Sequence, residues 1–337
     1  QSVGVQFGPE VNAETGISNT LYMLTLPTDS AHIVEKGFQI MEDWAHNITF
    51  DGTEIDKERG IIVEEWRMNQ GMNLRFINKL YPALFEGSQY GVRIPLGKKE
   101  IIEGAPHERI RQFYSDWYRP DLMAFVVVGD IDPVAVEKSI RAHFSAIKNP
   151  ENPRPRQDYP VPGHSGTRPL VMTDKEMPLL QIMMFCKIDP EKEILQKDYR
   201  RSLVNTLVSG MLTHRFNGLK AKPNPALLGA EVQFLPIVPE KDIFLIGAVA
   251  PETGTERAIE TMVVESERAV RHGFTAGELN RQKKEVLTAY ENAYNERDKT
   301  NSVSYASEYL RNFLNEEPIP GIEFEYEFTR EYLEGIS

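Results

Sequence analysis

Two glutamates, Glu58 and Glu65, are the residues whose type and spacing could do chemistry. They lie in the helical-looking segment EIDKERGIIVEEWRMNQG, residues 54–71. On an α-helix, residues seven apart lie on one face, and Ile61 and Ile62 fall between the two carboxylates. A carboxylate on a buried face needs a metal ion, a cation or several hydrogen-bond donors. The spacing therefore leaves two interpretations open: a metal or catalytic site, or the solvated rim of an amphipathic helix.

The histidines and the cysteine add no further ligand set. No histidine has another one four residues away, so no pair has the spacing that binds zinc from one helix face. The lone cysteine, Cys186, lies in LLQIMMFCKI, where it reads as a small buried residue of a strand. The chain therefore has neither a disulfide framework nor a thiolate metal site. The seven histidines are His32, His46, His107, His143, His164, His214 and His272.

Composition limits the classes of partner. The chain has 337 residues, of which 41% are hydrophobic and 26% charged, as in soluble globular proteins. Its formal net charge of −12 argues against nucleic acid and anionic membrane surfaces. No apolar run is long enough to span a bilayer, so we expect no membrane insertion.

The expected elements form two domains. The first, residues 1–148, has strands at residues 20–27 and 122–131 and helices at about residues 30–47 and 53–70. A proline-rich linker covers residues 149–166. The second domain, residues 167–337, has strands near residues 168–173, 179–188, 229–237 and 242–250, a helix at about residues 199–217, and helices that begin near residues 255 and 275.

An internal repeat relates the two domains without a gap. The matching pairs are all 224 positions apart, and each copy reads strand, proline turn, helix, F-x-x-x-E-[IL], helix. Two such domains indicate a duplication. The pairs are Pro27 with Pro251, Phe50 with Phe274, Glu54 with Glu278, Ile55 with Leu279, Lys57 with Arg281, Arg59 with Lys283, Ile62 with Val286 and Val63 with Leu287.

The repeat separates residues of the fold from residues of a site. Glu58 aligns with Gln282 and Glu65 with Ala289, so the second copy keeps the fold residues and lacks both carboxylates. A residue required by the fold would be expected in both copies, whereas a site can be lost from one. If the copies are of similar length, the first domain lacks roughly 60 residues ahead of Gln1.

Four stretches of the sequence resemble the pitrilysin/insulinase family of zinc metallopeptidases, the inverzincins. They occur in family order and span nearly the whole chain. The likeness is greatest to bacterial members in which one long polypeptide holds two such two-domain halves, and this chain resembles most of the N-terminal half. The stretches are GPEVNAETGISNTLYMLTLP, FDGTEIDKERGIIVEEWRM, FYSDWYRPDLMAFVVVGDIDP and HGFTAGELNRQKKEVLTAYENAYNERDKT.

The resemblance implies a fold and a set of site residues. The fold is α+β, with two duplicated domains that each have a mainly antiparallel sheet and helices on one face, as in mitochondrial-processing-peptidase-like metallohydrolases. Family members bind zinc through H-x-x-E-H and a downstream glutamate, and the motif's Glu is the general base. By resemblance Glu65 is the metal ligand and Glu58 the second carboxylate that orients the site. Asn12 and Ala13 match the strand that pairs with the substrate backbone.

The sequence departs from the family pattern because it contains no H-x-x-E-H. The family spacing places the motif, with its general base, shortly before Gln1, so this chain contains no catalytic residue. The arginine and tyrosine that contact the reaction intermediate come from the other half of family members. We therefore expect the chain alone to hold no zinc and to be inactive. Its expected partners are the C-terminal half of the same polypeptide or a homologous subunit.

Two functions are consistent with these observations. The first is a part of a zinc-dependent metalloendopeptidase that hydrolyses peptides or unfolded proteins with zinc-activated water. The alternative is a non-catalytic peptide-binding or scaffold member of the same family. Both carboxylates favour the first, since a scaffold has no use for them on a buried face. Bacterial members are often exported, which favours the periplasm.

Overall fold

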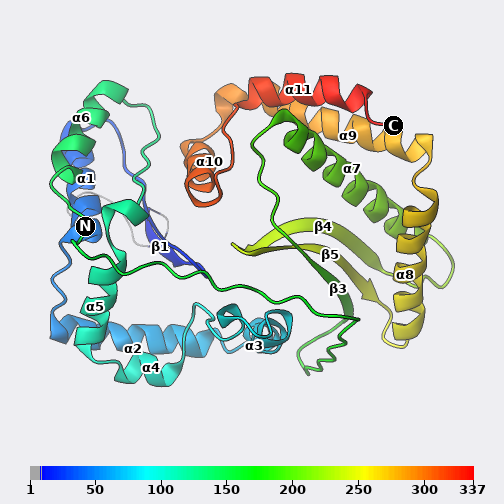
Figure 1. Cartoon of the computed structure of the whole chain (residues 1–337), viewed down its shortest axis with the longest axis horizontal. Helices are drawn as coiled ribbons and strands as arrows, with labels where there is room; N and C mark the ends of the chain where they lie inside the picture. Colours follow the sequence, from blue (N-terminus) through cyan, green and yellow to red (C-terminus); the bar gives the residue numbers. More distant parts are fainter. Residues whose placement is uncertain (1–7, 9) are drawn as a thin grey trace. The chain divides into compact units, whose positions relative to one another are not determined.

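The chain forms two compact units, Gln1–Met172 and Thr173–Ser337, and each is described by itself. The computed structural model describes Gly8 and residues 10–337. Both units combine helices with a small antiparallel sheet, as expected for the α+β class (Figure 1). None of the helices in these residues is long and apolar enough to cross a bilayer.

Unit 1 is a hairpin followed by helices. Strands β1 (Val11–Thr15) and β2 (Thr20–Leu24) pair antiparallel, with Asn12 opposite Met23. Six helices follow, and α6 packs on α1 while α4 packs on α2. They are α1 (Ala31–His46), α2 (Gly52–Met68), α3 (Met72–Leu84), α4 (Lys99–Gly104), α5 (His107–Trp117) and α6 (Pro133–Phe144), with 3-10 turns η1 (Gln89–Gly91) and η2 (Pro120–Leu122).

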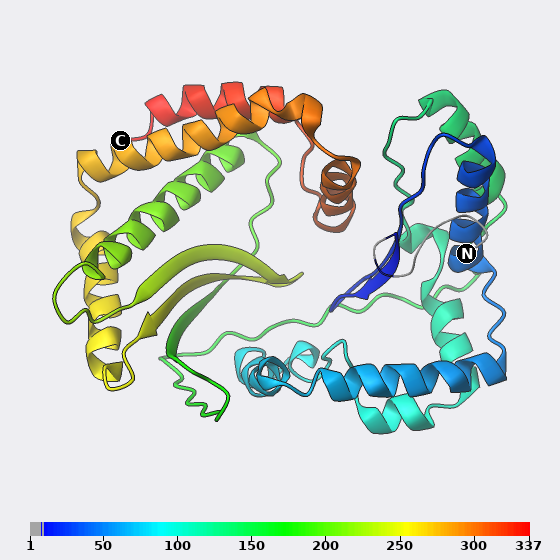
Figure 2. The same cartoon turned by 180° about the vertical axis from the view of Figure 1, so that it is seen from behind.

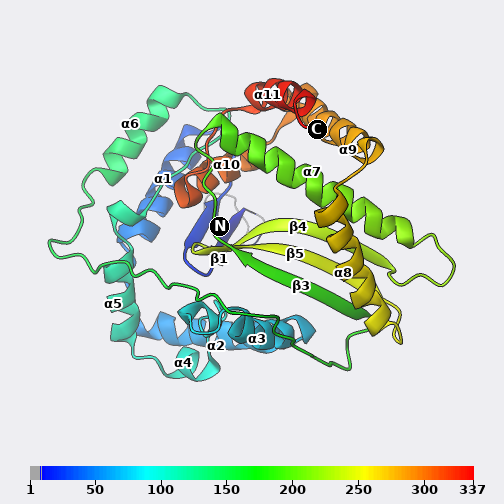
Figure 3. The same ribbon diagram turned by 45° about the vertical axis from the view of Figure 1, so that its right-hand side comes forward.

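Unit 2 is a three-stranded antiparallel sheet with helices against it. The strand order is β3-β5-β4, and α7 and α8 pack on the sheet while α9 lies along α7 and α11 along α9 (Figures 2 and 3). The elements are β3 (Leu180–Ile188), α7 (Gln196–Leu219), β4 (Gly229–Val238), β5 (Lys241–Ala250), α8 (Thr255–His272), α9 (Ala276–Asn295), η3 (Arg297–Lys299), α10 (Ser302–Asn315) and α11 (Ile322–Glu334).

The duplication is visible in the order of the elements. Strand β2 and helices α1 and α2 correspond to β5, α8 and α9 at the offset found in the sequence. Helices α2 and α9, which correspond to each other, both begin at a side-chain cap. Asp51 accepts hydrogen bonds from the backbone of Thr53 and Glu54, and Thr275 forms a capping box with Glu278. Local capping therefore fixes the start of the same helix in both units.

Three sequence expectations were wrong. Residues 122–131 and 168–173 form no strand in the described chain, because a strand needs a ladder partner and none of the described strands pairs with them. Phe125 instead packs its ring against Phe38 and Phe144. Cys186 lies in β3 as expected but is exposed. The helices that cover Ile182 and Met184 therefore do not reach it.

The proline-rich segment has no regular structure but is held against unit 1. Arg119 is buried and donates to the carbonyl oxygen of Arg154 at 2.7 Å, while Arg154 pairs with Asp116 at 2.9 Å. Val161 is buried, and Tyr159 contacts the ring of Tyr90. The boundaries proposed for this linker stay a prediction.

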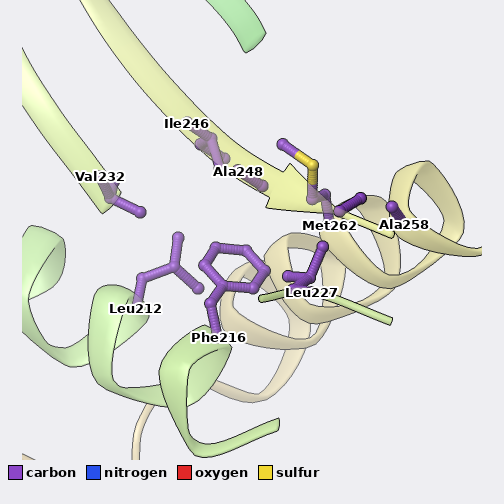
Figure 4. Packing of buried hydrophobic residues seen from close by; sticks show 9 residues of the cluster. Leu212, Phe216, Leu227, Val232, Ile246, Ala248, Ala258 and Met262 are labelled. Atoms are coloured by element: carbon purple, nitrogen blue, oxygen red, sulfur yellow. The ribbon is translucent and has the colours of Figure 1, made fainter. Parts of the chain in front are cut away.

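The core of unit 2 joins the sheet to α7 and α8. Phe216 of α7 has 0% exposure and lies beside Leu227, Ile246 and Met262 (Figure 4). Burial of apolar side chains in this cluster is a large favourable contribution to the folding free energy of unit 2.

Truncating Phe216 should therefore destabilise unit 2 strongly. We expect Phe216→Ala to lower the free energy of unfolding by about 3–5 kcal/mol, because the cavity adds to the lost transfer free energy. Urea unfolding followed by circular dichroism measures it. The control Val270→Ala, at an exposed site, should change stability by less than about 0.5 kcal/mol. Equal effects of both variants would contradict this account of the core.

A charged histidine joins α1 to α6 in unit 1. His143 of α6 lies between two carboxylates of α1, with Nδ1 2.6 Å from Glu42 Oε2 and Nε2 3.0 Å from Glu35 Oε1. Because carboxylates only accept hydrogen bonds, both ring nitrogens carry protons. The hydrogen bond to Glu42, followed by the one to Glu35, raises the pKa of His143 against the opposing effect of burial.

The α1–α6 contact should weaken at alkaline pH. A raised folded-state pKa means that the stabilisation is complete below the unfolded pKa, about 6.5, and is lost as pH rises through the folded value. We expect the melting temperature of unit 1 to fall across this window, and His143→Gln to remove most of that pH dependence. Thermal melts from about pH 6 to pH 9 test this. A pH dependence unchanged in His143→Gln would assign it to other groups.

Candidate functional site

Helix α2 carries the two candidate carboxylates, and its inner face packs on α4. Val63 is the buried residue of this helix. Arg59 lies on the same side and donates hydrogen bonds to the carbonyl oxygens of Ile102 and Ala105 at the end of α4. These contacts fix the rotation of α2 about its own axis, and so determine where its other residues point.

The expectation that Glu58 and Glu65 share a buried face was wrong. Both are exposed, as are Ile61 at 61% and Ile62 at 37%. The reason is the position of α4, which packs on the side of α2 that bears Arg59. The buried Val63 lies about 100° around the helix from Ile62. Periodicity predicted the shared face correctly but did not predict which face the neighbouring helix covers.

The structure brings no third ligand to these carboxylates. No group of three His, Cys, Asp or Glu residues suited to a metal ion occurs in residues 10–337. Four histidines have other partners. His143 binds Glu35 and Glu42, His107 binds Asp56, His214 binds Glu285, and His164 binds the carbonyl oxygen of Gly166.

Unit 2 shows what covers the equivalent face of α9. Gln282 and Val286, the counterparts of Glu58 and Ile62, are both buried. Val286 belongs to the cluster that α9 forms with Leu207 and Met211 of α7. Gln282 lies against Gly210 of α7, where a Cβ atom would overlap its amide. In the second copy, this helix face is therefore a helix–helix contact.

An ion pair completes that contact. Arg215 of α7 binds Glu278 of α9 through two hydrogen bonds, and the Nη2–Oε2 distance is 2.9 Å. This pairing holds the pKa of Glu278 down to about 2. The counterpart in unit 1, Glu54, pairs with Lys57 one turn along the same helix at 2.6 Å. Among the described residues of unit 1, no arginine is paired with it.

Neither Gly210 nor Arg215 was singled out from the sequence. The sequence does hold a signal for Arg215. Glu54 and Glu278 form a repeat pair, and a carboxylate that occurs in both copies predicts a cation beside it. Gly210 had no such signal. Its role depends on how closely α9 approaches α7, which only the packed structure gives.

Strand β1 holds the candidate substrate-binding residues at its outer edge. Thr25 N donates to Glu10 O at 2.8 Å, and Gly16 N donates to Asn19 O at 2.8 Å. Because bonded pairs alternate along an antiparallel ladder, Asn12 bonds to β2 and Ala13 directs its backbone N–H to the other side. The side chain of Asn12 accepts that N–H at 2.9 Å.

The comparison with known families assigns the chain. The profile described as "Peptidase M16 inactive domain" matches residues 105–286, which is more than half of the chain. The profile described as "Insulinase (Peptidase family M16)" matches residues 2–94. The chain belongs to the insulinase family of peptidases, M16, whose members include zinc proteases.

Among individual proteins, the similarity is to PqqL-type proteases. A zinc protease PQQL-like protein of Arabidopsis thaliana is 28% identical over 338 residues, which cover 100% of this chain and 32% of the relative. The probable zinc protease PqqL of Escherichia coli is 26% identical over 345 residues, which cover 100% of this chain and 36% of the relative. The chain thus spans about a third of the length of these relatives.

Solved structures agree with this assignment. The first half of the periplasmic protease PqqL from Escherichia coli superposes with a TM-score of 0.92 at 25% identity, over 100% of this chain and 72% of that one. Pitrilysin shares the fold, with a TM-score of 0.64 at 15% identity. The expected metallohydrolase fold is confirmed.

The hydrogen bond between Asn12 and Ala13 can be tested directly. We expect Asn12→Ala to speed hydrogen exchange at the Ala13 amide, because the outward N–H loses its acceptor. Exchange followed by NMR measures it. The control Asn69→Ala removes an exposed asparagine of unit 1 that binds Glu65 O, and should leave the Ala13 amide unchanged. An Ala13 amide that exchanges equally in both variants would place its acceptor elsewhere.

Proposed function

We propose that this chain forms part of a zinc-dependent metalloendopeptidase that hydrolyses peptide bonds. The observation that carries the proposal is the exposed face of α2 that bears Glu58, Ile61, Ile62 and Glu65. Its counterpart in unit 2 packs against a helix, so we infer that a helix also covers it in the working enzyme. Membership of the insulinase family supports an H-x-x-E-H helix as that cover.

The described residues do not make a zinc site by themselves. A catalytic zinc takes three protein ligands and an open position, and this face offers carboxylates only. When bound, zinc would supply a water of lowered pKa as the nucleophile. We assign Glu65 as the carboxylate ligand and Glu58 as the residue that positions the site. The chain alone then holds no stoichiometric zinc and is inactive.

Peptide binding is assigned to β1. An extended peptide can add to a free strand edge through backbone hydrogen bonds. Ala13 offers an outward N–H there, and Asn12 holds it until a substrate carbonyl takes its place. The substrate is accordingly a peptide or an unfolded protein that can present an extended backbone.

The relatives support the remaining assignments. Since they are about three times as long as this chain, we propose a second half of the same polypeptide or a homologous subunit as partner. Residues 1–148 form the metal-binding domain and residues 167–337 the non-catalytic one, with residues 149–166 between them. The structure of a periplasmic relative supports the periplasm as the compartment.

One observation favours a second candidate. The chain contains no H-x-x-E-H, and helix α7, which covers α9 in unit 2, carries no metal motif either. If the helix that covers α2 also lacks the histidines, Glu65 has no zinc ion to bind. The protein would then be a non-catalytic peptide-binding or scaffold member of the family.

Zinc content of the protein encoded by the complete gene separates the two candidates. We expect Glu65→Gln to abolish stoichiometric zinc and peptidase activity, and Glu58→Gln to weaken zinc binding about ten- to a hundredfold. Metal analysis and a quenched-fluorescence peptide assay measure both. The matched control is Glu64→Gln, since Glu64 is also exposed on α2 and pairs with Arg67. A wild-type protein without zinc would establish the non-catalytic candidate, and zinc retained by Glu65→Gln would refute the ligand assignment.

A further inference from the structure

The β1–β2 hairpin needs an anchor, because a two-stranded hairpin by itself is only marginally stable in water. Its ladder bonds stay between its own strands, and all of β1 except Val11 is exposed. Within the described residues 11–24, one hydrogen bond reaches another element of unit 1. It joins Tyr22 Oη of β2 to Tyr118 Oη at 2.6 Å. Tyr118 follows α5 directly, so this bond ties the hairpin to a helix.

Four aromatic rings form the contact around this bond. The ring centroid of Tyr22 lies 5.5 Å from that of Trp44 in α1, and Tyr118 stacks on Tyr114 of α5 at 4.3 Å. Tyr114 in turn donates its hydroxyl to the backbone oxygen of Trp44 at 2.7 Å. Packed aromatic rings contribute apolar area and a specific geometry. The cluster therefore joins β2, α1 and α5.

The register places Tyr22 directly behind the free edge of β1. Ala13 lies opposite Tyr22, and Asn12 lies opposite Met23. Since Asn12 and Met23 form a bonded pair, Ala13 and Tyr22 form the other kind, in which the Cα atoms are only about 4.5 Å apart. The side chain that anchors the hairpin thus stands beside the residue whose N–H is directed outward.

A second contact holds the base of the hairpin. A Cβ atom at Gly37 of α1 would overlap Leu26 Cδ1 and would lie 3.7 Å from Leu24 Cδ2, so α1 approaches the end of β2 closely. Leu24 pairs with Val11, two residues before Ala13. This contact fixes where the hairpin begins, whereas the Tyr22 contact fixes the part of β1 that carries Ala13.

The anchoring bond persists at physiological pH. Burial, followed by the hydrogen bond with Tyr118, raises the pKa of Tyr22. Its phenol therefore keeps its proton near neutrality. A phenol both donates and accepts, so the two hydroxyls can bond to each other without a charge on either side.

We propose that Tyr22 and Tyr118 are positioning residues that hold the edge of β1 where an extended peptide can add to it. This role rests on the proposed function, because it requires β1 to be the peptide-binding strand. A peptide that adds to a strand edge gains affinity from backbone hydrogen bonds. A hairpin detached from α5 would have to be ordered again on binding, which costs free energy.

Tyr118→Phe tests this role, because it removes one hydroxyl and leaves the sequence of the hairpin unchanged. We expect the ladder amides of Asn12 and Met23 to exchange roughly two- to tenfold faster, as the loss of one hydrogen bond predicts. The population competent for binding falls as well, so fluorescein-labelled β-casein, an unfolded chain, should bind about two- to fivefold more weakly. NMR hydrogen exchange and fluorescence anisotropy on the 337-residue chain measure the two effects.

The matched control is Tyr159→Phe, which removes a hydroxyl that accepts from Arg93 at 2.8 Å elsewhere in unit 1 and should change neither value. Adding Tyr22→Phe to Tyr118→Phe should enlarge neither effect, because the two hydroxyls bond each other. Unchanged exchange in Tyr118→Phe would overturn the positioning role and leave the peptide assignment of β1 intact. Faster exchange with unchanged casein binding, or no casein binding by the unaltered chain, would overturn that assignment and the positioning role with it.

Discussion

The packing of one amphipathic helix against another, as α9 packs on α7, is the contact on which unit 2 depends. In unit 2, α9 packs on α7 through Val286 and is held there by the Arg215–Glu278 pair. Helix α11 lies along α9 as well. A charged pair that is partly buried contributes only when its hydrogen bonds are good, and here they are bidentate.

The same reasoning explains why the two units inform each other. Unit 2 contains α7, which covers the face of α9 that is exposed on α2. Unit 2 therefore records a contact whose counterpart on α2 is open in unit 1. The duplicated sequence makes this comparison possible at the level of single residues, as with Glu58 and Gln282.

The sequence predicted local features such as helix positions well, but it did not predict which elements lie next to one another. Helices α2 and α9 begin within one residue of the expected positions, and the structure shows a side-chain cap at each start, Asp51 and the Thr275–Glu278 box. The shared face of Glu58 and Glu65 also follows from helical geometry alone. Its exposure does not, because burial depends on where α4 lies. The apolar run at residues 122–131 failed for a similar reason, since a strand is defined by its partner and the run carries no information about one.

The contact between Gln282 and Gly210 bears on how the second unit can evolve. Gln282 Oε1 is buried without a hydrogen-bond partner among the described residues, and a Cβ atom at position 210 would overlap the Gln282 amide. A histidine placed at position 210 would collide with Gln282, and a glutamate at position 282 would bury a charge that nothing neutralises. Either change alone would destabilise unit 2, so this contact opposes the placement of a metal site on that face.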